Sequence, residues 1–289
     1  MSIKIDNLTK KFSDDKGIFN INLSINNNEV VGFLGPNGAG KTTTIRHLLG
    51  LIKQDNGSCF INGLNCFKDQ YLIQKFLAYL PGELSLFEKM SGYDYLCFIA
   101  QLNKVKNLDR MHYLIDYFEL DSKKIIKKMS KGMKQKVGLI SVFMQDVSIY
   151  ILDEPTSGLD PIMQTKFIEL VNGLKNKTIL LSSHNFYEIE KMCDKVAIIN
   201  NGKIVAYENI DVLVKKQRKV YRVVFDGDYS IIKDDLNIIK EDKEYVDILV
   251  KDDINDFIKF ISKVKIKSLS MVSQSLDEIF LDYYGGINE

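Results

Sequence analysis

Nine consecutive residues, from Gly35 to Thr43, constrain the fold of this 289-residue chain more than any other segment. Their sequence, GPNGAGKTT, matches the pattern G-x-x-x-x-G-K-S/T. The apolar run 30–34 before the loop predicts a buried strand, and residues 44–49 after it predict a helix. Glycines let such a loop turn its backbone N–H groups inward around an anion, and the helix N-terminus adds partial positive charge. Strand, loop and helix together therefore predict a nucleoside triphosphate site rather than an ordinary turn.

Two side chains of this loop have the chemistry for phosphate and metal contacts. Lys41 can reach the β and γ phosphates, and the hydroxyl of Thr42 can ligate Mg²⁺. The loop residues expected to bind the nucleotide are Gly35, Pro36, Asn37, Gly38, Ala39, Gly40, Lys41, Thr42 and Thr43.

A second motif supplies acidic groups. The apolar run 148–152 is typical of a strand buried on both faces, and it ends in Asp153-Glu154-Pro155. A carboxylate at the end of such a strand, beside a phosphate loop, is suited to hold Mg²⁺, and we assign that role to Asp153. Glu154 is expected to act as the general base toward the attacking water.

The overall composition limits the classes of partner. Thirty-nine basic and thirty-eight acidic residues leave a net charge of +1, so no global charge attracts nucleic acid or anionic lipid. The four cysteines show no C-x-x-C spacing and are expected to be free thiols in a reducing compartment. No apolar window reaches the length of a membrane span, so we expect a cytoplasmic protein whose membrane role requires a partner.

The segment between the two motifs contains a possible second anion site. Ser130 is a good helix N-cap, and apolar residues recur at helical spacing over 133–144. The Ser130 hydroxyl and the N–H of Gly132 would then lie at a helix N-terminus. On this segment alone a simple capped helix is the preferred interpretation. A second anion site would instead allow two chains to pair head to tail, each capping the other's nucleotide.

Together the motifs resemble the nucleotide-binding subunit of an ATP-binding cassette (ABC) transporter, over roughly residues 1–215. Residues 35–43 are similar to the family's Walker A motif, 149–154 to its Walker B motif, and 129–133 to its signature. Ser157-Gly158-Leu159-Asp160 resembles the D-loop. The resemblance implies that Ser130 and Gly132 contact the nucleotide of a partner subunit and that Asp160 crosses to that subunit. Asp160 can also cap the following helix, because a proline follows it.

The resemblance also assigns roles to one histidine and one aromatic residue. His184 follows the predicted strand 178–183 and matches the family's switch histidine, which contacts the γ-phosphate. With Glu154 it completes the expected catalytic pair. Phe12 falls where the family places an aromatic that stacks on adenine, although a core or edge aromatic is also compatible with the sequence.

Two segments depart from the family pattern. In the signature, Lys131 and Met133 replace a glycine and a glutamine, but the anion-contacting residues remain and activity is expected to survive. The Q-loop position falls in residues 80–83, which contain no glutamine. Gly82 or Glu83 aligns with it, depending on register, and Glu83 is the candidate substitute. Both segments resemble the ABC-2 type exporter subgroup.

The predicted fold class is α/β: a P-loop NTPase of the ABC type with an N-terminal antiparallel sheet. Residues 1–215 form the ATP-binding domain, with a helical insert at about 83–145 that faces the membrane partner in this family. Residues 216–289 form a small accessory α/β module with predicted strands at 220–225, 245–250 and 266–272 and helices at 254–261 and from 275.

These predictions combine into one function. Two identical chains close over two Mg·ATP, and hydrolysis reopens the dimer. Closure drives export of an unknown substrate through a separate integral membrane permease, with the chain on the cytoplasmic face of the membrane. The alternative is a soluble ABC ATPase that acts on ribosomes or DNA. Such proteins usually carry two cassettes or long coiled coils, whereas this chain has one cassette and no heptads, so nucleic acid is not expected as a partner.

Overall fold

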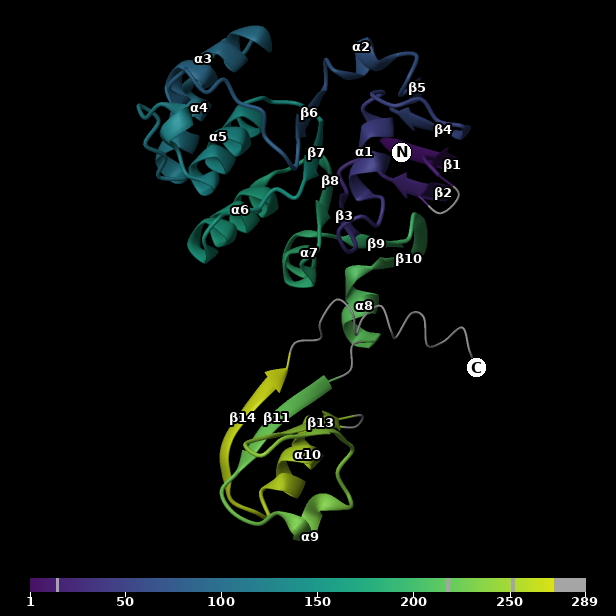
Figure 1. The fold of residues 1–289 in the computed structure, drawn as a ribbon, viewed down its shortest axis with the longest axis vertical. Coiled ribbons are helices and arrows are strands. Elements are labelled where there is room, and N and C mark those ends of the chain that lie inside the picture. Colours follow the sequence, from purple (N-terminus) through teal and green to yellow (C-terminus); the bar gives the residue numbers. More distant parts are fainter. Residues whose placement is uncertain (14–15, 217–218, 251–252, 273–289) are drawn as a thin grey trace. The chain divides into compact units, whose positions relative to one another are not determined.

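A computed structural model describes residues 1–13, 16–216, 219–250 and 253–272. Contacts between residues divide the chain into two compact units, Met1–Asp211 and Val212–Glu289 (Figure 1). The division falls inside helix α8 (Ile210–Lys216) rather than after residue 215.

A six-stranded sheet forms the centre of the first unit, in the order β10-β9-β3-β8-β7-β6. Strands β9, β3, β8, β7 and β6 run parallel to one another, and β10 pairs antiparallel with β9 through a hairpin at Asn201-Gly202. Because both faces are covered, the inner strands β7 and β8 are buried along their whole length and are mainly apolar, as expected for a parallel sheet. The strands are β3 (Val30–Leu34), β6 (Leu77–Leu80), β7 (Ile149–Asp153), β8 (Thr178–Ser183), β9 (Lys195–Asn200) and β10 (Lys203–Asn209).

The predicted N-terminal antiparallel sheet is confirmed, in the order β2-β1-β4-β5. Apolar residues alternate along its first two strands, and their inward side chains join the main core. The sequence did not identify the other two strands. The bounds are β1 (Ile3–Lys11), β2 (Gly17–Ile25), β4 (Asn56–Ile61) and β5 (Leu64–Asn65).

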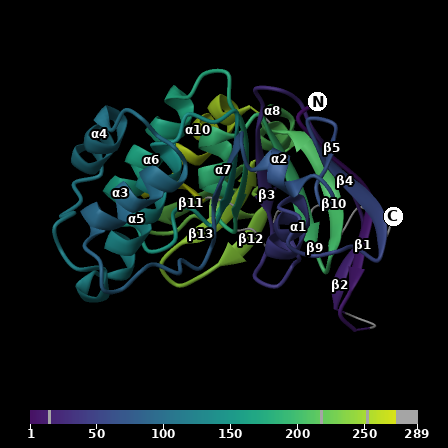
Figure 2. The same ribbon diagram turned by 90° about the horizontal axis from the view of Figure 1, so that it is seen from above.

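Helices lie on both sides of the central sheet. In both ribbon views α3, α4 and α5 gather on one side of it, and α1 and the antiparallel sheet lie on the other (Figures 1 and 2). The helices are α1 (Lys41–Leu48), α2 (Gln70–Ile73), α3 (Gly92–Leu102), α4 (Asp109–Tyr117), the 3₁₀ helix η1 (Ile126–Lys128), α5 (Lys131–Phe143), α6 (Pro161–Gly173) and α7 (Phe186–Met192).

The start of the helical insert differs from the prediction. Helix α3 begins at Gly92, where Ser91 caps it by accepting from the N–H of Asp94. Residues 83–90, predicted to be helical, form an irregular segment instead. The ring of Phe87 packs against Phe98, with centroids 5.5 Å apart, so this segment gains its apolar contact without forming a helix.

The second unit is a small α/β module whose sheet has the order β12-β13-β11-β14. Three predicted strands and one helix are confirmed, and the core is built on Val223, Val246 and Ile248. The predicted helix from Ser275 lies outside the described residues. The elements are β11 (Lys219–Phe225), α9 (Ser230–Lys233), β12 (Ile238–Glu241), β13 (Val246–Val250), α10 (Ile254–Ile261) and β14 (Ile266–Val272).

Two further sequence predictions concern the thiols and the membrane. All four cysteines are free, as expected. Among the described residues, no helix combines the length and the apolar character that a membrane span requires.

One buried histidine on α1 makes stability depend on pH. His47 is buried, its Nδ1 lies 2.8 Å from the Thr43 carbonyl oxygen, and its Nε2 has no hydrogen-bond partner among the described residues. Burial lowers the pKa of His47 below its ordinary 6.5. The unfolded chain therefore takes up a proton at a higher pH than the folded chain does. Above about pH 6.5 His47 does not lower the free energy of unfolding. Below that pH its titration lowers the free energy of unfolding by up to about 1.4 kcal/mol per pH unit.

The His47→Asn variant tests this effect, because its amide can still donate to the Thr43 carbonyl but does not titrate. Free energies of unfolding from urea melts at pH 8 and pH 5.5 should fall less with acid in the variant than in the parent. Equal acid sensitivity of the two proteins would contradict the role of His47.

Candidate functional site

A cleft of about 490 Å³ lies beside the loop that joins β3 to α1. Besides this loop, four other segments contribute to its wall: the end of β1, the start of β2, the turn after β7 and the β9–β10 turn. The lining residues are Phe12, Lys16, Gly17, Pro36, Asn37, Gly38, Gly40, Lys41, Thr42, Thr43, Glu154, Asn201 and Gly202.

The loop conformation depends on glycine at Gly40. Its φ of 111° lies in the region that other residues rarely adopt, and a Cβ there would lie 2.8 Å from the side chain of Ile18. Helix α1 begins directly after it, so the first N–H groups of the helix are directed toward the loop. Lys41 is 6% exposed, and its Nζ lies 2.6 Å from the Gly35 carbonyl oxygen.

Asp153 and Thr42 meet at the C-terminal end of β7. The Thr42 hydroxyl donates to Oδ2 of Asp153 at 2.8 Å, across 111 residues of sequence. The other carboxylate oxygen of Asp153 accepts from the Ser182 hydroxyl on neighbouring β8. Because parallel strands end at the same edge of the sheet, these groups lie together beside the phosphate loop. Two oxygen ligands of the kind that Mg²⁺ prefers are therefore adjacent.

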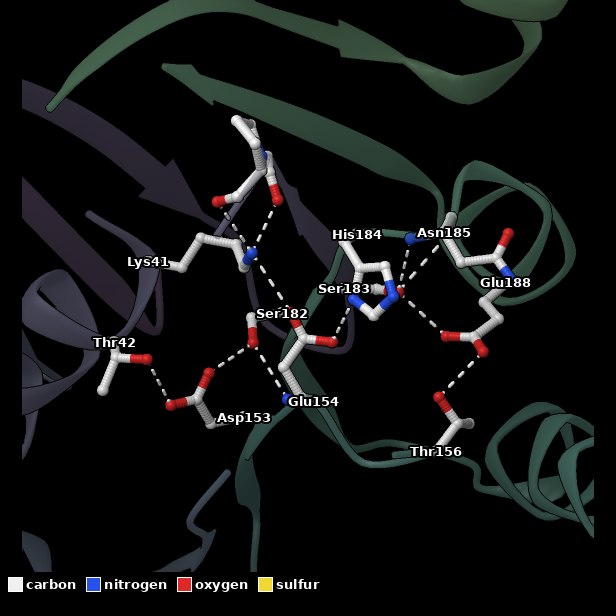
Figure 3. Close-up of polar contacts among 12 residues, drawn as sticks. Lys41, Thr42, Asp153, Glu154, Thr156, Ser182, Ser183, His184, Asn185 and Glu188 are labelled. Atoms are coloured by element: carbon white, nitrogen blue, oxygen red, sulfur yellow. Dashed lines mark hydrogen bonds and ion pairs between the residues drawn. The ribbon is translucent and has the colours of Figure 1, made fainter. Parts of the chain in front are cut away.

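Glu154 lies between the lysine and the histidine (Figure 3). Its Oε1 is 3.1 Å from Nζ of Lys41, and its Oε2 is 2.7 Å from Nδ1 of His184. The backbone N–H of Glu154 donates to the Ser182 hydroxyl at 3.0 Å. Its φ of 48° is unusual for a residue other than glycine, so the turn after β7 holds this side chain in a strained backbone conformation. The carboxylate is thus directed toward the phosphate loop.

Comparison with known proteins identifies the family. The family model described as ABC transporter matches residues 18–157. An uncharacterized ABC transporter ATP-binding protein of Methanocaldococcus jannaschii is 34% identical, over 97% of this chain and 98% of that protein. This chain belongs to the ABC transporter ATP-binding proteins. It is therefore an ABC-type ATPase that binds and hydrolyses ATP.

Other relatives of this ABC protein differ in what they transport. The bacitracin transport ATP-binding protein of Bacillus licheniformis is 36% identical, over 75% of this chain and 72% of that protein. Matches include both an osmoprotectant import protein of Salmonella typhimurium and a lipopolysaccharide export protein of Haemophilus influenzae. A solved ATP-binding subunit of an ABC transporter has a TM-score of 0.68 and 28% identity, over 75% of this chain and 93% of that structure. The family is therefore clear, whereas both directions of transport occur among the relatives.

Not all predicted nucleotide-binding residues of this ABC protein line the cleft. Phe12 does, and its 60% exposure rules out a core aromatic. Gly35 and Ala39 lie behind the cleft wall. The Gly35 carbonyl accepts from Lys41, and the Ala39 carbonyl accepts from the N–H of Gly202. These two residues therefore hold the loop in shape.

The predicted partner-contacting residues lie outside the residues that line the cleft. Ser130 caps α5 by accepting from the N–H of Met133, and Asp160 caps α6 in the same way. A Cβ at Gly132 would lie 2.6 Å from the Gly158 carbonyl oxygen, so the signature segment packs directly on the D-loop. Both predicted N-caps are thus present.

The segment with the missing glutamine lies beside the carboxylate of Asp153. A Cβ at Gly82 would lie 3.5 Å from the carboxylate of Asp153, whereas Glu83 is exposed. Burial and then the charge of Asp153 raise the pKa of Tyr79, on adjacent β6, to about 12, so this phenol stays neutral. Gly82 is therefore the member of the pair next to Asp153.

Several residues of the site could not be found from the sequence. Ser182 bonds both acidic residues, and Lys16, Asn201 and Gly202 complete the cleft wall. None belongs to a sequence motif that we recognised as functional. Their roles depend on which strands become neighbours in the fold.

Proposed function

We propose that this chain is the ATP-hydrolysing subunit of an ABC exporter and works with a separate integral membrane permease. The proposal is carried by the contacts of Glu154 beside the phosphate loop, where its carboxylate lies 3.1 Å from Nζ of Lys41 and 2.7 Å from Nδ1 of His184. A cation for the phosphates, a base for water and a group that orients the base are thus together.

The proposed reaction uses these three side chains. The loop N–H groups and Lys41 bind the β and γ phosphates, and Phe12 stacks on the base. Glu154 accepts a proton from the attacking water as the water oxygen bonds to the γ-phosphorus. The bond from the γ-phosphorus to the bridging oxygen breaks, and ADP and phosphate leave. His184, held at Glu154, orients the carboxylate and reaches the γ-phosphate.

Thr42 and Asp153 would hold Mg²⁺ in this reaction. Their oxygens already lie 2.8 Å apart at the edge of the sheet. The ion, when bound, supplies positive charge against the phosphate oxygens.

We further infer that two copies of the chain close over two ATP molecules. Ser130 of each chain is exposed at the N-terminus of α5, a position at which a helix favours an anion. Ser130 and Gly132 would contact the nucleotide that the other copy binds. Asp160, close to the same helix end through the Gly132–Gly158 contact, would also reach the other copy.

An apolar groove supports docking of a permease on the cytoplasmic face of the membrane. Its volume is about 390 Å³, and it lies between α3 and the segments after α1 and β6. Leu49, Leu51, Leu84, Tyr95 and Ile99 contribute to its wall. The groove and the exposed ring of Phe87 would accept a short apolar segment of the permease. Export, rather than import, is favoured by the two segments that resemble ABC-2 exporters.

Co-expression with a candidate permease tests the proposal. The chain should then co-purify with detergent-solubilised membranes. Reversing two exposed charges near the groove, Glu88→Lys with Lys89→Glu, should lower recovery by about tenfold, because the reversal would place like charges opposite each other at the interface. ATP binding should be unchanged, since neither residue lines the cleft.

Lys175→Glu, an exposed charge reversal after α6, is the control and should not change recovery. Export is read separately, as ATP-dependent loss of candidate substrates from cells that express both proteins. Recovery with ribosomes or DNA, and never with a membrane protein, would contradict the transporter proposal.

A further inference from the structure

A buried carboxylate lies outside the cleft and has no role in the proposed reaction. Glu188, on α7, is only 4% exposed. Its Oε1 accepts from the Thr156 hydroxyl at 2.8 Å, and its Oε2 accepts from the Ser183 hydroxyl at 2.9 Å. Within the described part of the chain Glu188 makes no ion pair. Burying a carboxylate without a cation is unfavourable. The presence of Glu188 at this position, with only two hydroxyls as partners among the described residues, therefore calls for an explanation.

These two bonds join the segments that carry the proposed catalytic pair. Thr156 lies in the turn after β7, two residues beyond Glu154. Ser183 is the last residue of β8 and directly precedes His184. Figure 3 shows the Glu188 carboxylate between the two hydroxyls, on the far side of His184 from Lys41. One side chain therefore fixes the turn after Glu154 to the strand end before His184.

Neighbouring contacts make this connection stiffer. The Ser183 hydroxyl also accepts from the N–H of Asn185 at 2.9 Å, on the other side of His184. Buried Gln135, on the signature helix α5, donates to the Pro155 carbonyl oxygen at 2.7 Å. Buried polar groups thus hold the backbone on both sides of the catalytic pair.

We propose that Glu188 is a positioning residue for ATP hydrolysis, which keeps His184 in register with Glu154. The proposal rests on the proposed roles of that pair. A carboxylate can accept from the two hydroxyls through its two separate oxygens, whereas an amide has one acceptor oxygen and an apolar side chain has none. Without it, the turn and the strand end lose their cross-link, and the 2.7 Å contact between His184 and Glu154 loosens. Displacing reacting groups by about 1 Å can lower the rate of a reaction by about a hundredfold, so a looser contact between His184 and Glu154 should slow hydrolysis.

The first test is a split between turnover and binding. Glu188→Ala should lower kcat by about tenfold or more and leave the ATP dissociation constant, measured by calorimetry, unchanged. Binding is spared because Glu188 contacts no residue of the phosphate loop. Glu188→Gln, which keeps one acceptor oxygen, should recover part of the loss. Glu190→Ala removes a partly exposed carboxylate from the same helix and should hydrolyse normally.

The second test asks whether Glu188 acts through His184. Single-turnover rates with γ-labelled ATP should be compared for Glu188→Ala, His184→Ala and the double variant. If Glu188 only positions His184, the Glu188 substitution should have little further effect once His184 is absent. Full additivity, or an equal loss of ATP affinity, would mean a general structural role and would overturn the proposal.

A third variant covers the case in which Glu188→Ala does not fold. Thr156→Val removes one hydrogen bond at nearly constant shape and should lower kcat in the same selective way. Normal turnover in this variant, with intact thermal unfolding, would overturn the proposal. If instead His184→Ala and Glu154→Gln both turn over normally, the proposed catalytic pair itself is wrong, so the two failures can be told apart.

Discussion

The Lys41→Ala variant is expected to lose nucleotide binding almost completely. Lys41 is nearly buried, and its Nζ is directed at the loop by the carbonyl oxygens of Gly35 and Pro36. A bound triphosphate would take up this fixed cation with charge-assisted hydrogen bonds to two phosphates. Losing them should weaken ATP binding by at least about a hundredfold. Calorimetric titration with ATP measures the change.

Lys16→Ala is the matched control, because Lys16 lines the same cleft but is exposed. Its affinity for ATP should fall far less, since exposed charge pairs contribute little. The thermal unfolding midpoint of both variants shows whether the fold survives. An Lys41→Ala protein that is folded and binds ATP with the parental affinity would place the triphosphate elsewhere.

The parts of the site that sequence reasoning found are those that share a local motif. The phosphate loop has its strand, glycines, lysine and helix within a short segment, so each part supports the others. Asp153 and Glu154 were found because a buried parallel strand must end at the ligand edge of the sheet. Two N-caps, Ser130 and Asp160, were found because capping depends on residues only three positions away.

The remaining parts depend on contacts between distant segments. Ser182 bonds Asp153 and the N–H of Glu154 only because β7 and β8 become neighbours, in a register that no local pattern encodes. Glu188 reaches Thr156 across 32 residues for the same reason. Residues 83–90 have a pattern compatible with a helix, but tertiary contacts of Phe87 hold them in an irregular segment. In these places packing, not local propensity, decides the outcome.

The Glu154→Gln variant is expected to bind ATP and to stop hydrolysing it. The amide has nearly the same shape, so its oxygen can face Lys41 while its NH₂ group faces Nδ1 of His184. The site should therefore keep its geometry. An amide cannot accept the proton of the attacking water, so kcat should fall by about two to four orders of magnitude. Steady-state phosphate release and ATP titration measure the two effects.

The same variant reports on pairing of two chains. If each chain contributes Ser130 and Gly132 to the other's nucleotide, uncleaved ATP should hold two copies together, visible by size-exclusion chromatography. Glu190→Gln, the same change on a partly exposed carboxylate, should hydrolyse ATP and show no such dimer. Hydrolysis near the parental rate in Glu154→Gln would exclude Glu154 as the base. Loss of turnover without an ATP-held dimer would leave the base in place but contradict the head-to-tail pairing, because both signature residues would then have no nucleotide to contact.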